Sequence, residues 1–238
     1  MCNLCSANRP FLSRRAMLSG SAALLAAGAA PMTAFAQAEK PQNAISPDQA
    51  LKRIMDGNIR YAANKPAQKD FSAGRAARAK AQHPVAAILS CADSRVAPEL
   101  AFDQGPGDLF VVRVAGNFVN DDGLASLEFA VQFLGVPLIM VLGHSSCGAV
   151  ASTIRVINEG ITLPGQLQEM IRDIRPAVEK ARASKPENLL QAAIDENVRY
   201  GVRRLTDAKP ILSEFVGGGK IQVIGANYDL ATGKVALL

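Results

Sequence analysis

Four short runs of apolar residues constrain the fold more than any other feature of this sequence. They are residues 85–90, 109–114, 138–142 and 221–224. Runs of this length without polar alternation are typical of strands buried on both faces. Stretches with helical spacing lie between them, at residues 124–134, 149–158, 166–182 and 187–206. This alternation predicts an α/β fold with a mostly parallel central β-sheet flanked by helices.

The two ends of the predicted domain differ from its middle. At the start, Ser46 and Pro47 form a typical helix beginning, an N-cap followed by proline, and a polar linker, residues 37–45, precedes them. At the end, residues 234–238 follow a link that is too short for a crossover connection. We therefore predict one folded domain over residues 46–238, with an antiparallel C-terminal edge strand.

The net charge of +5 comes largely from the first 36 residues. This segment holds three of the 26 basic residues, Arg9, Arg14 and Arg15, and none of the 21 acidic ones. Since the remaining 23 basic and 21 acidic side chains nearly balance, the charge gives no reason to expect nucleic acid as a partner.

Residues 1–36 have the pattern of an export signal. Arg14 and Arg15 precede a small, apolar stretch that ends in Ala-Phe-Ala at residues 34–36. The paired arginines resemble a twin-arginine signal peptide, so we predict removal after Ala36 and a periplasmic or secreted protein that is exported folded. The alternatives are a signal anchor or an ordinary buried helix. Because the apolar stretch is short and rich in alanine and glycine, we expect no stable membrane anchor.

Cysteine and histidine are scarce in the part that would remain after cleavage. Cys2 and Cys5 belong to the predicted signal peptide, and we assign them no function. Cys91 and Cys147 are the other two cysteines, and a disulfide between them would be the default in an oxidising compartment.

Two polar clusters follow predicted strands and offer another interpretation. Cys91 comes directly after the first apolar run, and His144 and Cys147 follow the third. In an open α/β sheet functional groups gather beyond the carboxyl ends of the strands, so these side chains converge if the two strands are neighbours. Two thiolates and an imidazole suit zinc, and three protein ligands leave a fourth position open for catalysis. The spacing alone is equally consistent with Cys91 as a buried apolar residue and with His144 as a helix cap.

Four motifs carry a family resemblance. They are CADSR at residues 91–95, VVRVAGN at 111–117, GHSSCGA at 143–149 and GANYD at 225–229. Together they resemble the β-class carbonic anhydrases, over a match that runs from about residue 46 to the C-terminus. The resemblance implies one Zn²⁺ per subunit, held by Cys91, His144 and Cys147, with a catalytic Asp93–Arg95 pair beside it. It also implies a homodimer or higher homo-oligomer that reversibly hydrates CO₂ to bicarbonate and a proton through zinc-bound hydroxide.

The resemblance extends to further residues. Gln82 matches a glutamine that donates to bicarbonate, Phe110 matches an apolar wall of the CO₂ pocket, and Phe129 stands where plant-type members have tyrosine. In some members the counterpart of Asp93 leaves its arginine and becomes the fourth zinc ligand, which closes the site. Asp93 is thus a conditional fourth ligand here.

Two other functions fit parts of the sequence. The same zinc site could hydrolyse CS₂ or COS, as relatives of this fold do. A non-catalytic zinc- or bicarbonate-binding protein is the third reading, and the intact Asp93 and Arg95 weigh against it because a pure binder needs no pair to orient hydroxide.

Export gives the first testable prediction. Arg14→Lys together with Arg15→Lys should block translocation, because the twin-arginine route requires the paired arginines. Immunoblots of periplasmic and cytoplasmic fractions measure the distribution of the protein. A normal periplasmic yield of the double variant would contradict the predicted route.

Overall fold

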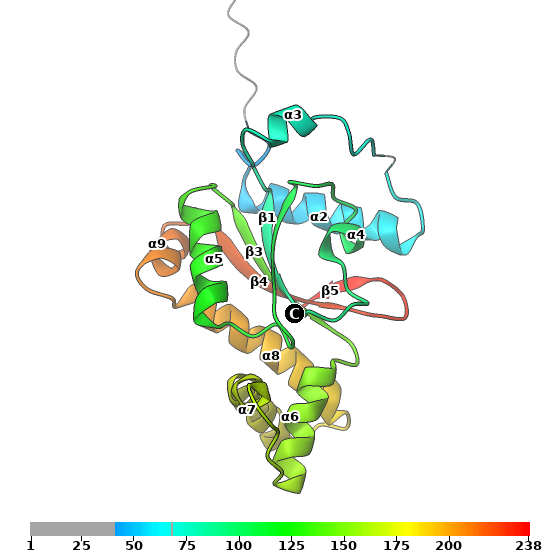
Figure 1. The fold of residues 1–238 in the computed structure, drawn as a ribbon, viewed down its shortest axis with the longest axis vertical. Helices are drawn as coiled ribbons and strands as arrows, with labels where there is room; N and C mark the ends of the chain where they lie inside the picture. Colours follow the sequence, from blue (N-terminus) through cyan, green and yellow to red (C-terminus); the bar gives the residue numbers. More distant parts are fainter. Residues whose placement is uncertain (1–40, 68) are drawn as a thin grey trace, which may run out of the picture. The chain divides into compact units, whose positions relative to one another are not determined.

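The computed structural model describes residues 41–67 and 69–238. The predicted signal peptide, Cys2, Cys5 and the first part of the predicted linker lie outside the described residues. Within them, one sheet contains β1 (Ala86–Ser90), β2 (Leu109–Arg113), β3 (Leu138–His144), β4 (Gln222–Tyr228) and β5 (Val235–Leu237). The strand order is β2-β1-β3-β4-β5; the first four strands run parallel, and β5 pairs antiparallel with β4 (Figure 1). The predicted mostly parallel sheet and its antiparallel edge strand are confirmed.

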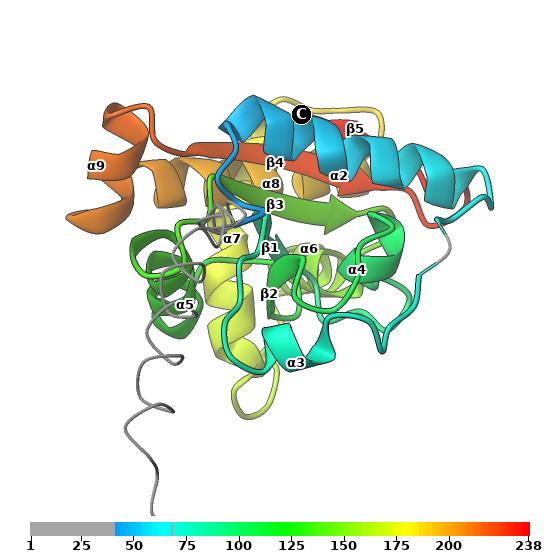
Figure 2. The same ribbon diagram turned by 90° about the horizontal axis from the view of Figure 1, so that it is seen from above.

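Helices cover both faces of the sheet (Figure 2). One face carries α2 (Pro47–Ala62) and α4 (Pro98–Ala101), and the other carries α5 (Asp121–Gln132), α8 (Leu189–Thr206) and α9 (Ile211–Gly217). Alternate residues of each strand point to opposite faces, so Ile88 and Met140 pack toward α2 while Leu89 and Val141 pack toward α5 and α8. Burial on both faces explains why the strands read as unbroken apolar runs. A short helix, α3 (Arg75–Arg78), precedes β1.

A third apolar cluster lies beyond the carboxyl ends of the strands. It is formed mainly by α6 (Gly148–Glu159), α7 (Leu167–Ala183) and the first half of α8, which lie together at the bottom of Figure 1. Its buried members include Phe118, Val150, Ile174 and Ile194, together with both cysteines of the described chain. The cysteines that follow β1 and β3 are therefore buried between the sheet and this helical layer.

None of the helices in the described ranges is long and apolar enough to span a membrane.

A buried carboxylate fastens α2 to the loop after α4. Asp103 has a side chain that is only 3% exposed, and it accepts hydrogen bonds from Arg60 Nε at 2.6 Å, Lys69 Nζ at 2.7 Å and the Ala67 amide at 3.0 Å. Burial opposes ionisation, but these donors and charges outweigh it and lower the pKa of Asp103 to about 2. A carboxylate whose pKa is lowered on folding stabilises the native state above its unfolded pKa of about 4, and this contribution is lost as the pH falls toward 2.

Asp103→Asn should therefore lower the free energy of unfolding at pH 7 by about 2.7 kcal/mol, the free energy that corresponds to a pKa lowered from about 4 to about 2. Asparagine tolerates the left-handed backbone of this position, where φ is +49°, so the substitution removes the charge and keeps the backbone conformation. Urea unfolding followed between pH 7 and pH 3 should show the two proteins converging below about pH 4. Asp56→Asn, which removes an exposed partner of Lys52, is the matched control and should cost under about 0.5 kcal/mol. Equal losses in both variants would contradict the assignment.

Candidate metal centre

Cys91, His144 and Cys147 converge at the carboxyl ends of β1 and β3. Cys91 directly follows β1, His144 is the last residue of β3, and Cys147 is the N-cap of α6. Their ligand atoms all lie within 4.8 Å of one another, and each residue is at most 4% exposed. Because β1 and β3 are hydrogen-bonded neighbours with Ser90 opposite Leu142, the two clusters separated in the sequence share one point in space. This is the arrangement on which the predicted metal site depends.

The loop between β3 and α6 fixes the imidazole. The amide of Ser145 donates to the carbonyl of Tyr228 at 2.9 Å, and the Ser145 hydroxyl accepts from the amide of Leu230 at 2.9 Å. His144 Nδ1 lies 2.9 Å from the carbonyl of Ser145, and since a carbonyl only accepts, Nδ1 carries the proton. Nε2 then presents a lone pair, yet it is buried and has no hydrogen-bond partner. A buried lone pair without a donor fits a metal ligand.

The two thiols and the imidazole change one another's pKa values. The pKa of Cys91 is lowered to about 4, chiefly by the hydrogen bond from Cys147, with His144 and the Gly116 amide adding to the effect and burial opposing it. The pKa of Cys147 is raised above its usual range by its contact with Cys91 and by burial. Burial lowers the pKa of His144, but the neighbouring Cys91 sulfur outweighs this and raises it. Ionisation of one thiol opposes ionisation of the other, whereas a divalent cation would stabilise both thiolates at once.

A glycine brings a backbone donor to the Cys91 sulfur. The amide of Gly116 donates to Sγ at 3.2 Å, and the carbonyl of Gly116 accepts from Nδ2 of the buried Asn197 on α8 at 2.8 Å. Gly116 has φ +88°, and a Cβ there would lie 2.5 Å from Cδ1 of Ile174. Only glycine therefore fits this position. Neither Gly116 nor Asn197 has a role that could be assigned from the sequence alone, although the AGN part of the 111–117 motif points to Gly116.

Asp93 and Arg95 form a two-point ion pair beside the cluster. Arg95 donates from Nε to Oδ1 at 2.9 Å and from Nη2 to Oδ2 at 2.7 Å, and its amide also donates to Oδ1 at 2.9 Å. These contacts hold the pKa of the Asp93 carboxyl well below its usual range. Oδ2 lies 3.9 Å from His144 Nε2, so the ionised carboxylate borders the space in front of the three ligands.

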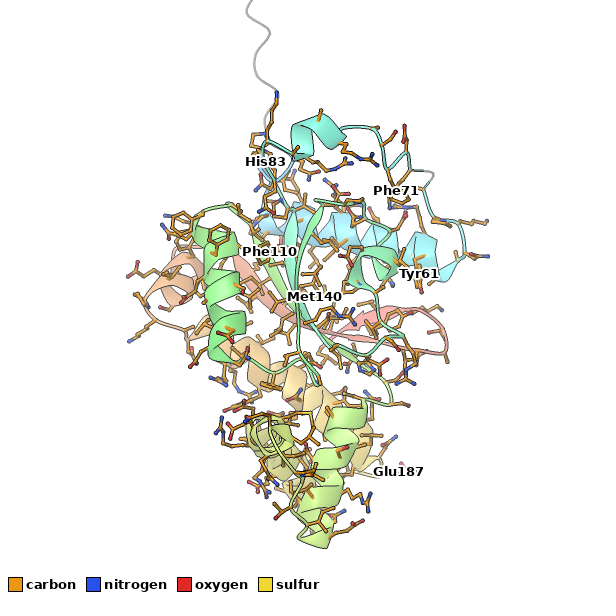
Figure 3. The ribbon with its side chains drawn as sticks, viewed as in Figure 1. Tyr61, Phe71, His83, Phe110, Met140 and Glu187 are labelled. Atoms are coloured by element: carbon orange, nitrogen blue, oxygen red, sulfur yellow. The ribbon has the colours of Figure 1, made fainter. Side chains whose placement is uncertain are left out.

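Gln82, Phe110 and Phe129 do not reach this cluster within the same chain. Gln82 is exposed and precedes β1, and Phe110 lies opposite Ala87 near the amino ends of the strands. Figure 3 shows His83, the neighbour of Gln82, beyond the amino end of β1, with Phe110 well above the helical layer that borders the cluster. Phe129 lies on α5 against Phe133, with ring centroids 5.3 Å apart. Parallel strands separate these residues from Cys91 because the cluster occupies their opposite ends.

Comparison with known proteins identifies the family. The family profile described as "Carbonic anhydrase" matches residues 86–235, a range that includes all three convergent side chains and the Asp93–Arg95 pair. The chain belongs to the β-class carbonic anhydrases. It is therefore an enzyme of CO₂ and bicarbonate interconversion.

Two curated bacterial carbonic anhydrases and two solved structures illustrate the similarity. The chain is 39% identical to carbonic anhydrase 2 of Mycobacterium tuberculosis over 81% of its own length and 93% of that protein, and 37% identical to a carbonic anhydrase of Mycolicibacterium smegmatis with the same coverage. The Coccomyxa β-carbonic anhydrase in complex with acetazolamide superposes with a TM-score of 0.63 at 28% identity, covering 79% of this chain and 86% of that one. The β-carbonic anhydrase CcaA gives a TM-score of 0.60 at 26% identity, covering 79% and 94%.

Proposed function

We propose that this carbonic anhydrase holds one Zn²⁺ per subunit on Cys91 Sγ, His144 Nε2 and Cys147 Sγ and uses it in the reversible hydration of CO₂. The observation that carries the proposal is the buried Nε2, which has no hydrogen-bond partner and lies within 4.8 Å of two buried thiols. A set of two sulfurs and one nitrogen suits zinc, and three protein ligands are typical of its catalytic sites. Zinc bound in this way supplies a Lewis acid that lowers the pKa of a water in its open position.

Asp93 orients the attacking hydroxyl in this proposal. Because Arg95 keeps the carboxylate ionised, Oδ2 can only accept a hydrogen bond. It therefore favours a hydroxyl that directs its hydrogen toward Asp93 and its lone pair toward CO₂. The two-point grip of the guanidinium fixes the plane of the carboxylate, which the single ammonium of a lysine would not do. A closed form, with Asp93 released from Arg95 to become the fourth zinc ligand, belongs to the same proposal.

Cys147→Ser tests the zinc site. Replacing a thiolate by a hydroxyl should remove most bound zinc and lower kcat/KM for CO₂ hydration by at least about 100-fold, since a hydroxyl is a poor zinc ligand. Stopped-flow hydration with metal quantification measures both, and Ser152→Ala on the same helix is the control. Wild-type zinc content and activity in Cys147→Ser would refute the proposal.

Assays of the wild-type protein with CS₂ and COS test the alternative substrates. Turnover of CS₂ or COS without CO₂ hydration would favour hydrolysis of these compounds as the activity.

We further propose that a second copy of the chain supplies Gln82, Phe110 and Phe129 to each zinc site. In one chain these residues lie at the amino ends of the strands, and the metal ligands lie at the carboxyl ends. Phe129 and Phe133 are 46% and 73% exposed, although such aromatic pairs are usually covered. A homodimer or higher homo-oligomer would cover them and would complete the pocket.

Mixed dimers test this arrangement. Cys147→Ser lacks a complete metal site, and Gln82→Ala with Phe129→Ala lacks the proposed pocket residues, so each protein alone should be nearly inactive. Co-refolding equal amounts should restore about a quarter of wild-type activity, because half of the dimers are mixed and each mixed dimer has one intact site. Mixing Cys147→Ser with His144→Ala is the control, since no subunit then carries a complete metal site. No gain over this control would contradict the proposal.

A further inference from the structure

Arg113 clamps the backbone of the loop that carries Cys91 and Asp93. It is the last residue of β2 and lies opposite Ser90, the last residue of β1. Its Nε donates to the carbonyl of Cys91 at 2.9 Å, and its Nη2 donates to the carbonyl of Asp93 at 2.7 Å. The guanidinium therefore continues the hydrogen bonding of β1 with β2 beyond the end of the strands, along a segment that has left the sheet.

The backbone hydrogen bonds between the ends of β1 and β2 stop just before Asp93. The amide of Val114 donates to the carbonyl of Ser90 at 3.1 Å, and the amide of Ala92 donates to the carbonyl of Val114 at 3.2 Å. After Ala92 this ladder ends. The side chain of Arg113 then holds the Cys91 carbonyl, and it shares the Asp93 carbonyl with the amide of Val96, which donates to it at 3.0 Å. Rotation of either peptide would move the adjoining Cα–Cβ bond, and with it Cys91 Sγ or the Asp93 carboxylate.

We propose that Arg113 is a positioning residue that sets the Cys91 thiolate and the Asp93 carboxylate relative to each other. Asp93 is held at both ends, at its carboxylate by Arg95 and at its carbonyl by Arg113. Arg113 makes no hydrogen bond or ion pair with the ligand atoms or with the Asp93 carboxylate, so its hydrogen bonds act through the backbone. The inference rests on the proposed zinc site and extends it by a residue that anchors one ligand and the orienting carboxylate together.

The shape of the guanidinium explains why arginine occupies this position. Two N–H groups of its rigid fork reach two carbonyls that are two residues apart. The single ammonium of lysine has a different reach and would satisfy only one of them, and methionine has the length without any donor. The functional order should therefore be arginine, then lysine, then methionine. A role in packing alone would make lysine and methionine equivalent.

Arg113→Met and Arg113→Lys, each in the full chain, test the inference. We expect Arg113→Met to weaken zinc binding, measured by chelator competition, and to lower kcat, each by roughly 10- to 100-fold, as losses of groups that orient metal ligands commonly do. KM for CO₂ should change little, because the residue does not touch the substrate. Arg113→Lys should lie between Arg113→Met and wild type in both measurements. Cobalt-substituted protein should show altered sulfur-to-cobalt charge-transfer bands in Arg113→Met.

Arg204→Met is the matched control. Arg204 also donates to a backbone carbonyl, that of Val119 at 2.7 Å, but does not contact the loop of Cys91 and Asp93. Its loss should leave zinc affinity, kcat and the cobalt spectrum unchanged. Wild-type zinc affinity and kcat in Arg113→Met would overturn the inference. So would equal losses of zinc affinity and kcat in Arg113→Lys and Arg113→Met, if these losses parallel a drop in the thermal unfolding midpoint. If wild-type protein binds no zinc, the proposed metal site fails instead, which separates the two results.

Discussion

The pairing of β1 with β3 is the constraint on which the site depends. β1 is an inner strand: β2 pairs with one of its edges and β3 with the other, so the loops that follow β1 and β3 leave the sheet side by side. One loop carries Cys91, and the other carries His144 and Cys147. A chain of mostly apolar strands thereby brings three polar ligands to one buried point, at the place where open α/β sheets generally bind their ligands.

Burial of two thiols and an imidazole would be costly without compensating contacts, and the surrounding backbone supplies them. The Gly116 amide donates to Cys91, Asn197 fixes Gly116, and the Ser145 carbonyl fixes the tautomer of His144. Two thiolates also offset the charge of a divalent metal, so the electrostatic potential at the site depends on charged and polar groups outside the ligand set. Asp93, held by Arg95 at its carboxylate and by Arg113 at its carbonyl, borders the same space.

Much of this arrangement could be predicted from local sequence. The apolar runs identified the strands because burial on both faces removes polar alternation, and the short link before residues 234–238 identified the antiparallel edge. The three ligands could be predicted to converge on the condition that the two strands are neighbours, because each ligand lies at or just beyond the end of a strand. Gly116, Asn197 and Arg113 could not be assigned, since their roles arise from backbone approach between segments distant in the sequence. The resemblance alone implied roles for Gln82, Phe110 and Phe129, and a single chain places them at the far end of the sheet.

X-ray absorption at the zinc edge, on full-chain protein purified without added metal, tests whether Cys91, His144 and Cys147 bind zinc. We expect a first shell of two sulfur atoms at about 2.3 Å together with nitrogen or oxygen at about 2.0–2.1 Å. Cys91→Ser and Cys147→Ser should each reduce the sulfur contribution of any zinc that remains. A first shell of nitrogen and oxygen alone in the wild-type protein would contradict the assignment of Cys91, His144 and Cys147 as the zinc ligands. An undiminished sulfur contribution in both single variants would contradict it as well.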